Sequence, residues 1–152
     1  MSTRYTIGLD YGTNSVRALV GDVANGREIA TAAWGYAHGT AGVILGRDPN
    51  LARQHPADYL QGAEVTIKQA LATAKKSVKG FRAEQVIGIG VDTTGSTPLP
   101  VDANGQPLAF QKKFANHPAA LAWLWKDHTG IAEAAEITVL AQKMRPHYLA
   151  KC

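Results

Sequence analysis

The chain has 152 residues, of which 45% are hydrophobic and 18% are charged, and a formal net charge of +4. This length suits one globular domain with its own core, and no stretch is apolar enough to predict a membrane-spanning helix. The single cysteine, Cys152, excludes an internal disulfide framework and a paired-cysteine metal site. We therefore expect a cytoplasmic protein, and we expect no secretory signal because the first ten residues run directly into a strand.

The first predicted elements are three strands. Residues 5–10 are rich in β-formers, and residues 15–22 alternate, with Val16, Ala18 and Val20 on one face. A turn signal at residues 24–26 separates the second strand from a third, REIATAAWGY. Short connections between consecutive strands predict an antiparallel three-strand meander.

A glycine-rich connection at residues 36–55 comes next and predicts a loop, of a length that is usually functional. Apolar residues then recur at spacings of three and four from Pro56 until Gly80, which predicts an amphipathic helix. The run QVIGIGVD at residues 85–92 is almost continuously apolar, which predicts a strand buried on both faces. A helix that leads into such a strand indicates a crossover onto the first sheet.

The last third of the chain predicts a loop at TTGSTPLP, a hairpin at LPVDANGQPL and a second helix that opens at HPAALAWLWKDH. His55 and His117 each precede a proline at a predicted helix start, and a local structural role is expected for both. The whole order predicts an α/β domain with a mixed sheet.

Two carboxylates, Asp10 and Asp92, are predicted at the C-terminal ends of core strands, the edge at which open α/β sheets bind ligands. In the turn YGTNS that follows Asp10, we expect Gly12 to adopt a backbone conformation closed to other residues, so that N–H groups point into a concavity. Such a turn beside a carboxylate suits Mg²⁺ and a phosphate chain. The alternative is a tight hairpin whose polar residues only satisfy turn geometry.

The opening GLDYGT resembles two families that share a ribonuclease-H-like core. One is the actin-like kinases, which include the FGGY carbohydrate kinases, and the other is the Holliday-junction-resolvase-like nucleases. In the nucleases, carboxylates at strand ends hold metal ions for attack on a phosphodiester. Asp10 and Asp92 suit either family, so this motif leaves both functions open.

Later segments resemble the FGGY kinases alone. VIGIGVDTTGSTPLPVDANGQPL is similar to the strand, sugar-lining loop and hairpin of that family, and LAWLWKDHTGIAEAAEI to its helix with a Trp-x-Asp element. Within the family, DTTGSTP, RQHPADYL and LWKDH are most similar to the L-ribulokinases. The resemblance extends over residues 5 to about 140. It implies an actin-like ATPase fold, here incomplete, and a kinase rather than a nuclease.

The resemblance also implies two groups of binding residues. ATP and Mg²⁺ are expected at the turn, with Asp10 beside the metal; the cofactor-binding residues are Asp10, Gly12, Thr13, Asn14, Ser15 and Arg17. The sugar is expected at Thr94, Gly95 and Ser96, where Gly95 leaves room for a pentulose, and against Trp125, with Asp127 nearby. Two alternatives stay open: Trp125 can instead pack in the core, and Asp92 can instead position the 93–97 loop.

The implied function is ATP-dependent phosphorylation of L-ribulose to L-ribulose 5-phosphate. Residues 1–145 match the N-terminal part of the family's first domain and residues 146–152 form an atypical tail. The second, ATP-binding domain and a match to the catalytic base aspartate are expected to be absent, so no catalytic residue is assigned and the chain is expected to be inactive alone. The expected partner is a ketopentose, and neither nucleic acid nor a membrane is expected as a partner. A homo-oligomer is an open alternative for the full-length enzyme. Alternatives are a xylulokinase, a metal-dependent nuclease and a non-catalytic sugar-binding remnant.

Overall fold

The computed structural model describes residues 3–149, within which the chain forms a four-stranded sheet, a three-stranded sheet and three helices. The strands are β1 Tyr5–Tyr11, β2 Ser15–Asp22, β3 Glu28–Gly35, β4 Ile44–Leu45, β5 Ala52–Gln54, β6 Val86–Thr93 and β7 Ala122–Trp123. The helices are α1 Pro56–Ser77, α2 Ile131–Met144 and α3 Pro146–Leu149, and single 3-10 turns occupy Ala83–Gln85, Leu108–Phe110 and Pro118–Ala120.

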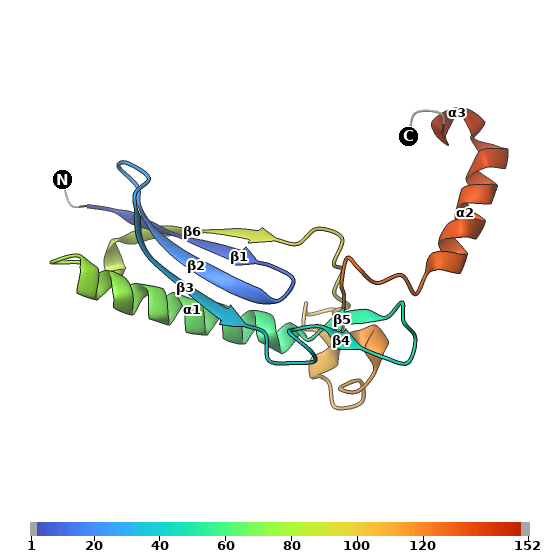
Figure 1. Cartoon of the computed structure of the whole chain (residues 1–152), viewed down its shortest axis with the longest axis horizontal. Helices are drawn as coiled ribbons and strands as arrows, with labels where there is room; N and C mark the ends of the chain where they lie inside the picture. Colours follow the sequence, from blue (N-terminus) through green and yellow to red (C-terminus); the bar gives the residue numbers. More distant parts are fainter. Residues whose placement is uncertain (1–2, 150–152) are drawn as a thin grey trace.

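The larger sheet has the strand order β3-β2-β1-β6. Strands β1, β2 and β3 form the expected antiparallel meander, and β6 lies parallel to β1 after the crossover through α1. Helix α1 covers one face of this sheet (Figure 1). The predicted meander, helix and crossover are therefore confirmed.

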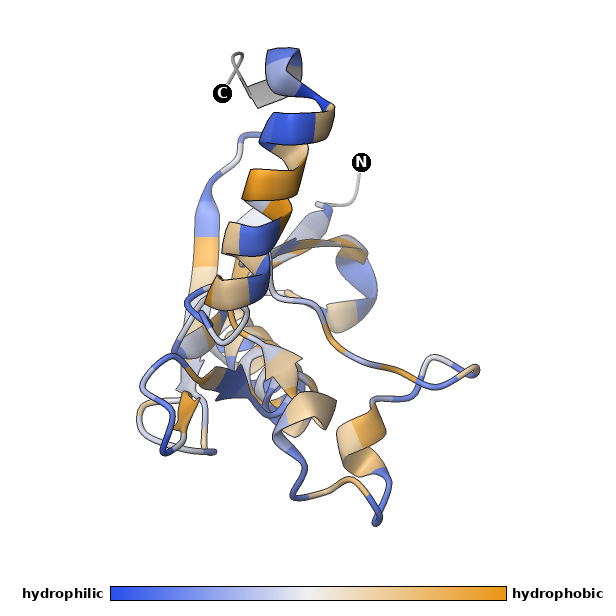
Figure 2. Ribbon diagram, turned by 90° about the vertical axis from the view of Figure 1, so that its right-hand side faces the viewer, coloured by the Kyte–Doolittle hydropathy of each residue, from blue (hydrophilic) through white to orange (hydrophobic). Residues whose placement is uncertain are grey.

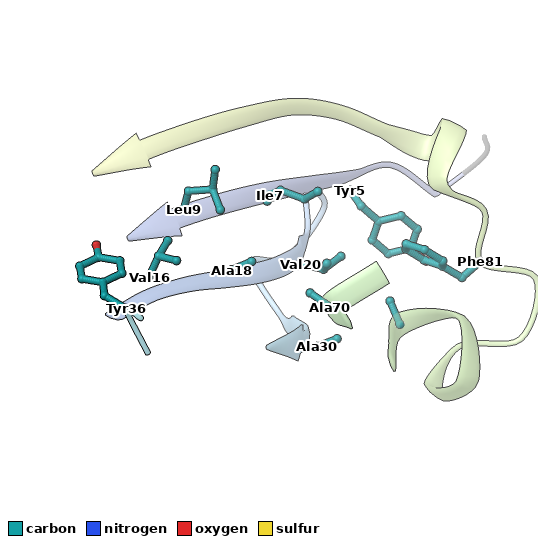
Figure 3. Close-up of a cluster of buried hydrophobic side chains, with 11 residues drawn as sticks. Tyr5, Ile7, Leu9, Val16, Ala18, Val20, Ala30, Tyr36, Ala70 and Phe81 are labelled. Carbon is teal, nitrogen blue, oxygen red and sulfur yellow. The ribbon is translucent and has the colours of Figure 1, made fainter. Parts of the chain in front are cut away.

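The core lies between the larger sheet and α1. Alternate residues of β1 and β2 point into it, and Figure 3 shows Ile7, Leu9, Val16 and Val20 gathered on this side of the sheet. A glycine allows the close approach of α1, because a Cβ atom on Gly62 would lie 2.3 Å from Val16 Cγ1. Burial of these side chains is the main force that holds the helix to the sheet.

A second, smaller sheet, in the order β4-β5-β7, lies at one end of the molecule (Figure 1). The segment 36–55 is therefore not only a loop, since it contains two short strands. The prediction of a helix that opens at HPAALAWLWKDH is wrong. One 3-10 turn follows His117, and β7 then pairs with β5. A helix would have broken this pairing and the bond from Trp123 N–H to the Pro98 carbonyl.

The prediction that residues 85–92 are buried on both faces is also wrong. In β6, Ile89 and Val91 share the core face of the sheet with Ile7 and Leu9, yet they are 57% and 62% exposed. Among residues 3–149, β6 is an edge strand and α1 covers β2 and β3 instead. Helix α2 stands away from the sheet, and Figure 2 shows hydrophobic turns along it that no other element covers.

The end of the chain is described only in part. Pro146–Leu149 forms α3. The remaining residues of the expected tail, 150–152, and with them Cys152, lie outside the described residues. In residues 3–149 no helix is long and apolar enough to cross a membrane.

Candidate functional site

The two predicted carboxylates are neighbours. Asp10 of β1 and Asp92 of β6 are register partners at the C-terminal ends of two parallel strands, on the face of the sheet opposite α1. That face forms an open hollow of about 800 Å³ in which small residues such as Gly8 and Gly90 leave space. Arg17, which pairs with Asp10 across β1 and β2, donates from Nη1 to Asp10 Oδ2 at 3.0 Å. The hollow therefore has two carboxylates and one guanidinium at its rim.

The turn between β1 and β2 is closed by one backbone bond, from Gly12 N–H to the Ser15 carbonyl at 2.9 Å. The backbone N–H groups of Thr13 and Asn14 have no acceptor within the described part of the chain. Gly12 is not among the glycines with positive φ in that part, so the expected special conformation is wrong. The free N–H groups result from a tight turn that ordinary backbone angles allow, and they suit an anion.

A buried glutamine holds the turn from below. Gln54, which is 1% exposed, donates from Nε2 to the Thr13 carbonyl at 2.8 Å, and its Oε1 accepts from the Tyr59 hydroxyl at 2.7 Å. Tyr11 in turn donates to the Tyr59 carbonyl at 3.2 Å. Strand β5 and helix α1 thus fix the Thr13 carbonyl on the side away from the hollow.

The expected sugar loop follows β6. Thr94 N–H donates to the Tyr11 carbonyl at 3.1 Å, which ties the start of the loop to β1. Ser96 has a φ of 52°, a left-handed conformation that is strained for a residue other than glycine and is found often at functional sites. No atom lies within 4 Å of a Cβ placed on Gly95, so the space beside it is open.

Trp125 contacts the turn between β1 and β2. Its side chain is 53% exposed, so it is not the core tryptophan of the alternative interpretation. Its Nε1 donates to Thr13 Oγ1 at 3.1 Å, across 112 positions of sequence. The structure therefore brings the tryptophan expected at the sugar wall against the turn expected to hold the phosphates, which we call the phosphate turn.

Asp127, expected near the same wall, lies in a buried environment. It is buried in an ion pair with Arg53, and its Oδ2 also accepts from Ala52 N–H at 2.8 Å. The guanidinium of Arg53 lies 3.7 Å from the ring centroid of Trp123. Asp127 thus joins the turn before α2 to strand β5, and its expected place near the sugar stays a prediction.

Behind the turn is a smaller cavity of about 200 Å³. Tyr11, Tyr36 and Tyr59 form one wall of it, with ring centroids about 5.8–5.9 Å apart in edge-to-face contacts. Burial, and then the charge of Asp58, raise the pKa of Tyr59 to about 12. Burial also raises the pKa of Tyr11 and Tyr36, so all three hydroxyls stay neutral at physiological pH.

The carboxylates present suit Mg²⁺. Magnesium is usually held by one or two carboxylates together with the phosphates of a substrate, rather than by a cage of protein ligands. Asp10 and Asp92 supply that set, and residues 3–149 contain no group of three or more potential metal-binding side chains. The chemistry of the site therefore agrees with a metal that binds together with a nucleotide.

Both histidines predicted to have local roles cap helices. His55 Nδ1 accepts from Ala57 N–H at the start of α1, and His117 Nδ1 accepts from Ala119 N–H. His38 stacks on His55 with ring centroids 4.1 Å apart, and its Nδ1 lies 2.7 Å from Oδ1 of the buried Asp58. Burial and the neighbouring His38 lower the pKa of His55.

Sequence reasoning missed the residues that support the site, which are Gln54, Tyr36 and Tyr59. Gln54 lies in the connection at residues 36–55, for which the sequence predicts only a loop. In the sequence pattern the two tyrosines count only as apolar residues. Their roles depend on contacts between residues that are 41 positions apart for Gln54 and Thr13 and 48 for Tyr59 and Tyr11, and no local pattern carries that information.

Comparison with known proteins supplies the family. The sequence profile of the N-terminal domain of the FGGY family of carbohydrate kinases matches residues 5–138. A ribulokinase of Vibrio parahaemolyticus serotype O3:K6 is 41% identical over 138 residues, which is 91% of this chain and 24% of the relative. A ribulokinase of Shouchella clausii is 42% identical over 153 residues, with 97% of this chain and 26% of the relative covered. The chain thus spans about a quarter of the length of these relatives.

Solved structures agree on the fold. A xyloylose kinase from Brucella ovis superposes with a TM-score of 0.66 at 24% identity and covers 88% of this chain and 23% of its own. A gluconate kinase from Lactobacillus acidophilus gives a TM-score of 0.64 at 17% identity, with 93% and 24% covered. At these identities the similarity shows the actin-like fold of sugar kinases, which confirms the expected fold class.

Proposed function

The chain belongs to the FGGY family of carbohydrate kinases, and on that premise we propose that it forms part of a kinase that phosphorylates L-ribulose with ATP. Residues 1–145 supply the N-terminal part of the first domain, and the product is L-ribulose 5-phosphate. The family match also decides between the two functions that the opening motif left open, in favour of the kinase.

One observation carries this proposal: the hydrogen bond from Trp125 Nε1 to Thr13 Oγ1. A kinase must hold a phosphoryl donor and an alcohol acceptor at adjacent sites, because catalysis of phosphoryl transfer is mostly positioning and charge stabilisation. The bond places the expected sugar wall in contact with the turn expected to hold the phosphates.

The turn and the strand residues beside it then have distinct roles. The free N–H groups of Thr13 and Asn14 donate to phosphate oxygens. Arg17, whose guanidinium is held beside Asp10 by their ion pair, neutralises charge on the transferred group. Asp10 and Asp92 hold Mg²⁺, which when bound supplies charge neutralisation for the phosphates.

The sugar is assigned from the relatives. Both bacterial relatives named above are ribulokinases and share about two residues in five with this chain. Thr94, Gly95, Ser96 and Trp125 form the expected sugar site, and the open space beside Gly95 supports room for a pentulose there. The partner is thus a small neutral sugar.

A chimeric enzyme tests the proposal. Residues 5–138 replace the matching segment of the Vibrio parahaemolyticus ribulokinase, and ADP formation is measured with L-ribulose, D-xylulose and D-gluconate. We expect turnover with L-ribulose above the other two sugars. A folded chimera that prefers D-xylulose would show a xylulokinase instead, and one that binds ATP but phosphorylates none of the three would contradict the proposal.

A further inference from the structure

The small cavity behind the phosphate turn is lined in part by Tyr36, whose buried hydroxyl has no partner within the described residues. Tyr36 is 6% exposed, and within residues 3–149 its hydroxyl is the one buried side-chain polar atom without a hydrogen bond. Figure 3 shows this oxygen at the end of the core, beyond Val16 and Leu9. Buried polar groups are nearly always paired in native proteins, so an unpaired one indicates a missing ligand or water.

The neighbouring hydroxyls show that Tyr36 is the exception. Tyr59 donates to Gln54 Oε1, and Tyr11 donates to the Tyr59 carbonyl. Both of these groups are therefore committed to the protein. Of the three tyrosines in the wall, Tyr36 alone keeps its O–H donor for something else that enters the cavity.

The lining defines the chemistry of that ligand. Besides the tyrosines it consists of Gly12 and three threonines, Thr93, Thr94 and Thr97, none of which is charged. An anion would find no cation here, and burial, then Tyr59 and Tyr11, and then Asp58 and Asp10 already disfavour negative charge on Tyr36. Aromatic walls with a few hydroxyls suit a neutral molecule that has both C–H and O–H groups.

The cavity is too large to be filled by a single bound water. The cavity measures about 200 Å³, several times the roughly 30 Å³ that a water molecule occupies in the liquid. Thr94 belongs both to this lining and to the loop expected to contact the sugar. The cavity is therefore continuous with the proposed sugar site, while Gly12 connects it to the phosphate turn.

We propose that this cavity receives part of the acceptor sugar and that the Tyr36 hydroxyl hydrogen-bonds one of its hydroxyl groups. The inference rests on the proposed function and adds Tyr36 as a sugar-binding residue. It predicts that Tyr36→Phe leaves the ligand-free protein as stable as before or more stable, because no bond is lost. The same change weakens sugar binding by about threefold to tenfold, the value of one hydrogen bond.

The test uses the 152-residue chain with ¹³C-labelled tyrosine and ¹⁵N-labelled tryptophan, followed by NMR during titration with L-ribulose, D-xylulose or inorganic phosphate. Comparison with Tyr36→Phe assigns the Tyr36 signal. We expect a neutral sugar to shift this signal saturably, with the dissociation constant raised in Tyr36→Phe. Inorganic phosphate should leave it unchanged. Tyr59→Phe is the matched control and should destabilise the free protein, since it removes the bond to Gln54.

Three results would overturn the inference. In the first, a sugar shifts the indole signal of Trp125 while that of Tyr36 stays fixed, or Tyr36→Phe binds the sugar as tightly as the unchanged chain. In the second, inorganic phosphate shifts the Tyr36 signal, so the cavity is not selective for neutral molecules. In the third, neither sugar shifts any signal. The chimera assay judges the proposed function separately in every case.

Discussion

At the scale of single residues, side chains from outside the turn between β1 and β2 set its position. Gln54 and Trp125 hold Thr13 from two sides, through its carbonyl and its hydroxyl. The residues expected to touch ligands could be named from the sequence, because short motifs carry them. Their supports could not, because Gln54 acts only through contacts that the fold creates.

The support by Gln54 can be measured. Gln54→Met keeps a similar shape but leaves the Thr13 carbonyl and the Tyr59 hydroxyl without partners. We expect the free energy of unfolding to fall by about 1–3 kcal/mol, the usual cost of an unsatisfied buried group. Urea unfolding checks this. A variant as stable as the unchanged protein would mean that the glutamine does not hold the turn.

His55 predicts a dependence of stability on pH. Burial and then His38 lower its pKa in the folded state, and Asp58 opposes them. Below the ordinary value of about 6.5 the unfolded chain then binds more protons than the folded one. The stabilisation is complete above pH 6.5 and is lost as the pH falls towards the folded pKa. His38, Asp58 and Phe110 are the groups that face this ring.

The measurement is the melting temperature between pH 8 and pH 5 for the unchanged protein and for His55→Asn. Asparagine also caps helices but does not titrate in this range. We expect the fall below pH 6.5 to be shallower in the variant. Two parallel profiles would show that another group is responsible.

At the scale of elements, long patterns were predictable and short ones were not. Both β2 and α1 could be predicted because many residues repeat one signal. That signal is the alternation in residues 15–22 for β2 and the apolar spacing from Pro56 for α1. Strands β5 and β7 have three and two residues, too few for a periodic signal. They are joined by backbone pairing and by the buried contact of Arg53 with Asp127. The expected helix at LWKDH failed for this reason.

The Arg53 contact therefore predicts a large loss on substitution. Arg53→Met leaves Asp127 as a buried charge without its partner, which costs about 3–5 kcal/mol at two side chains that are 3% and 5% exposed. The control is Lys68→Met, which breaks the exposed ion pair with Glu64 on α1. Urea unfolding should show a clear loss of stability in Arg53→Met and no measurable loss in Lys68→Met. Equal small effects in both variants would contradict a structural role for the buried pair.

At the scale of the whole molecule, the apolar surface of β6 is not covered within the described residues. Ile89 and Val91 are more than half exposed beside an unpaired strand edge. The apolar run predicted the strand correctly but not its exposure, because burial depends on what else packs against it. Exposed apolar strands at an edge favour association.

We therefore expect the 152-residue chain to associate as its concentration rises. Replacing both Ile89 and Val91 with threonine keeps the preference for strand and removes apolar surface, so it should lower the average mass in light scattering. The control is Leu60→Thr, a single exposed leucine on α1 that is 65% exposed. A chain that stays monomeric at every concentration would contradict this prediction.

The central claim is that this chain supplies the phosphate site of a sugar kinase, and its most direct test is the turnover of the chimeric enzyme with Asp10→Asn. The control is Asp48→Asn, since the Asp48 side chain lies in an exposed turn, where Oδ1 accepts from Asn50 N–H. We predict that Asp10→Asn lowers ADP formation with L-ribulose by about 100-fold or more, the scale seen when one stabilising group is lost, and that the control keeps full activity. Full turnover in Asp10→Asn would contradict the account.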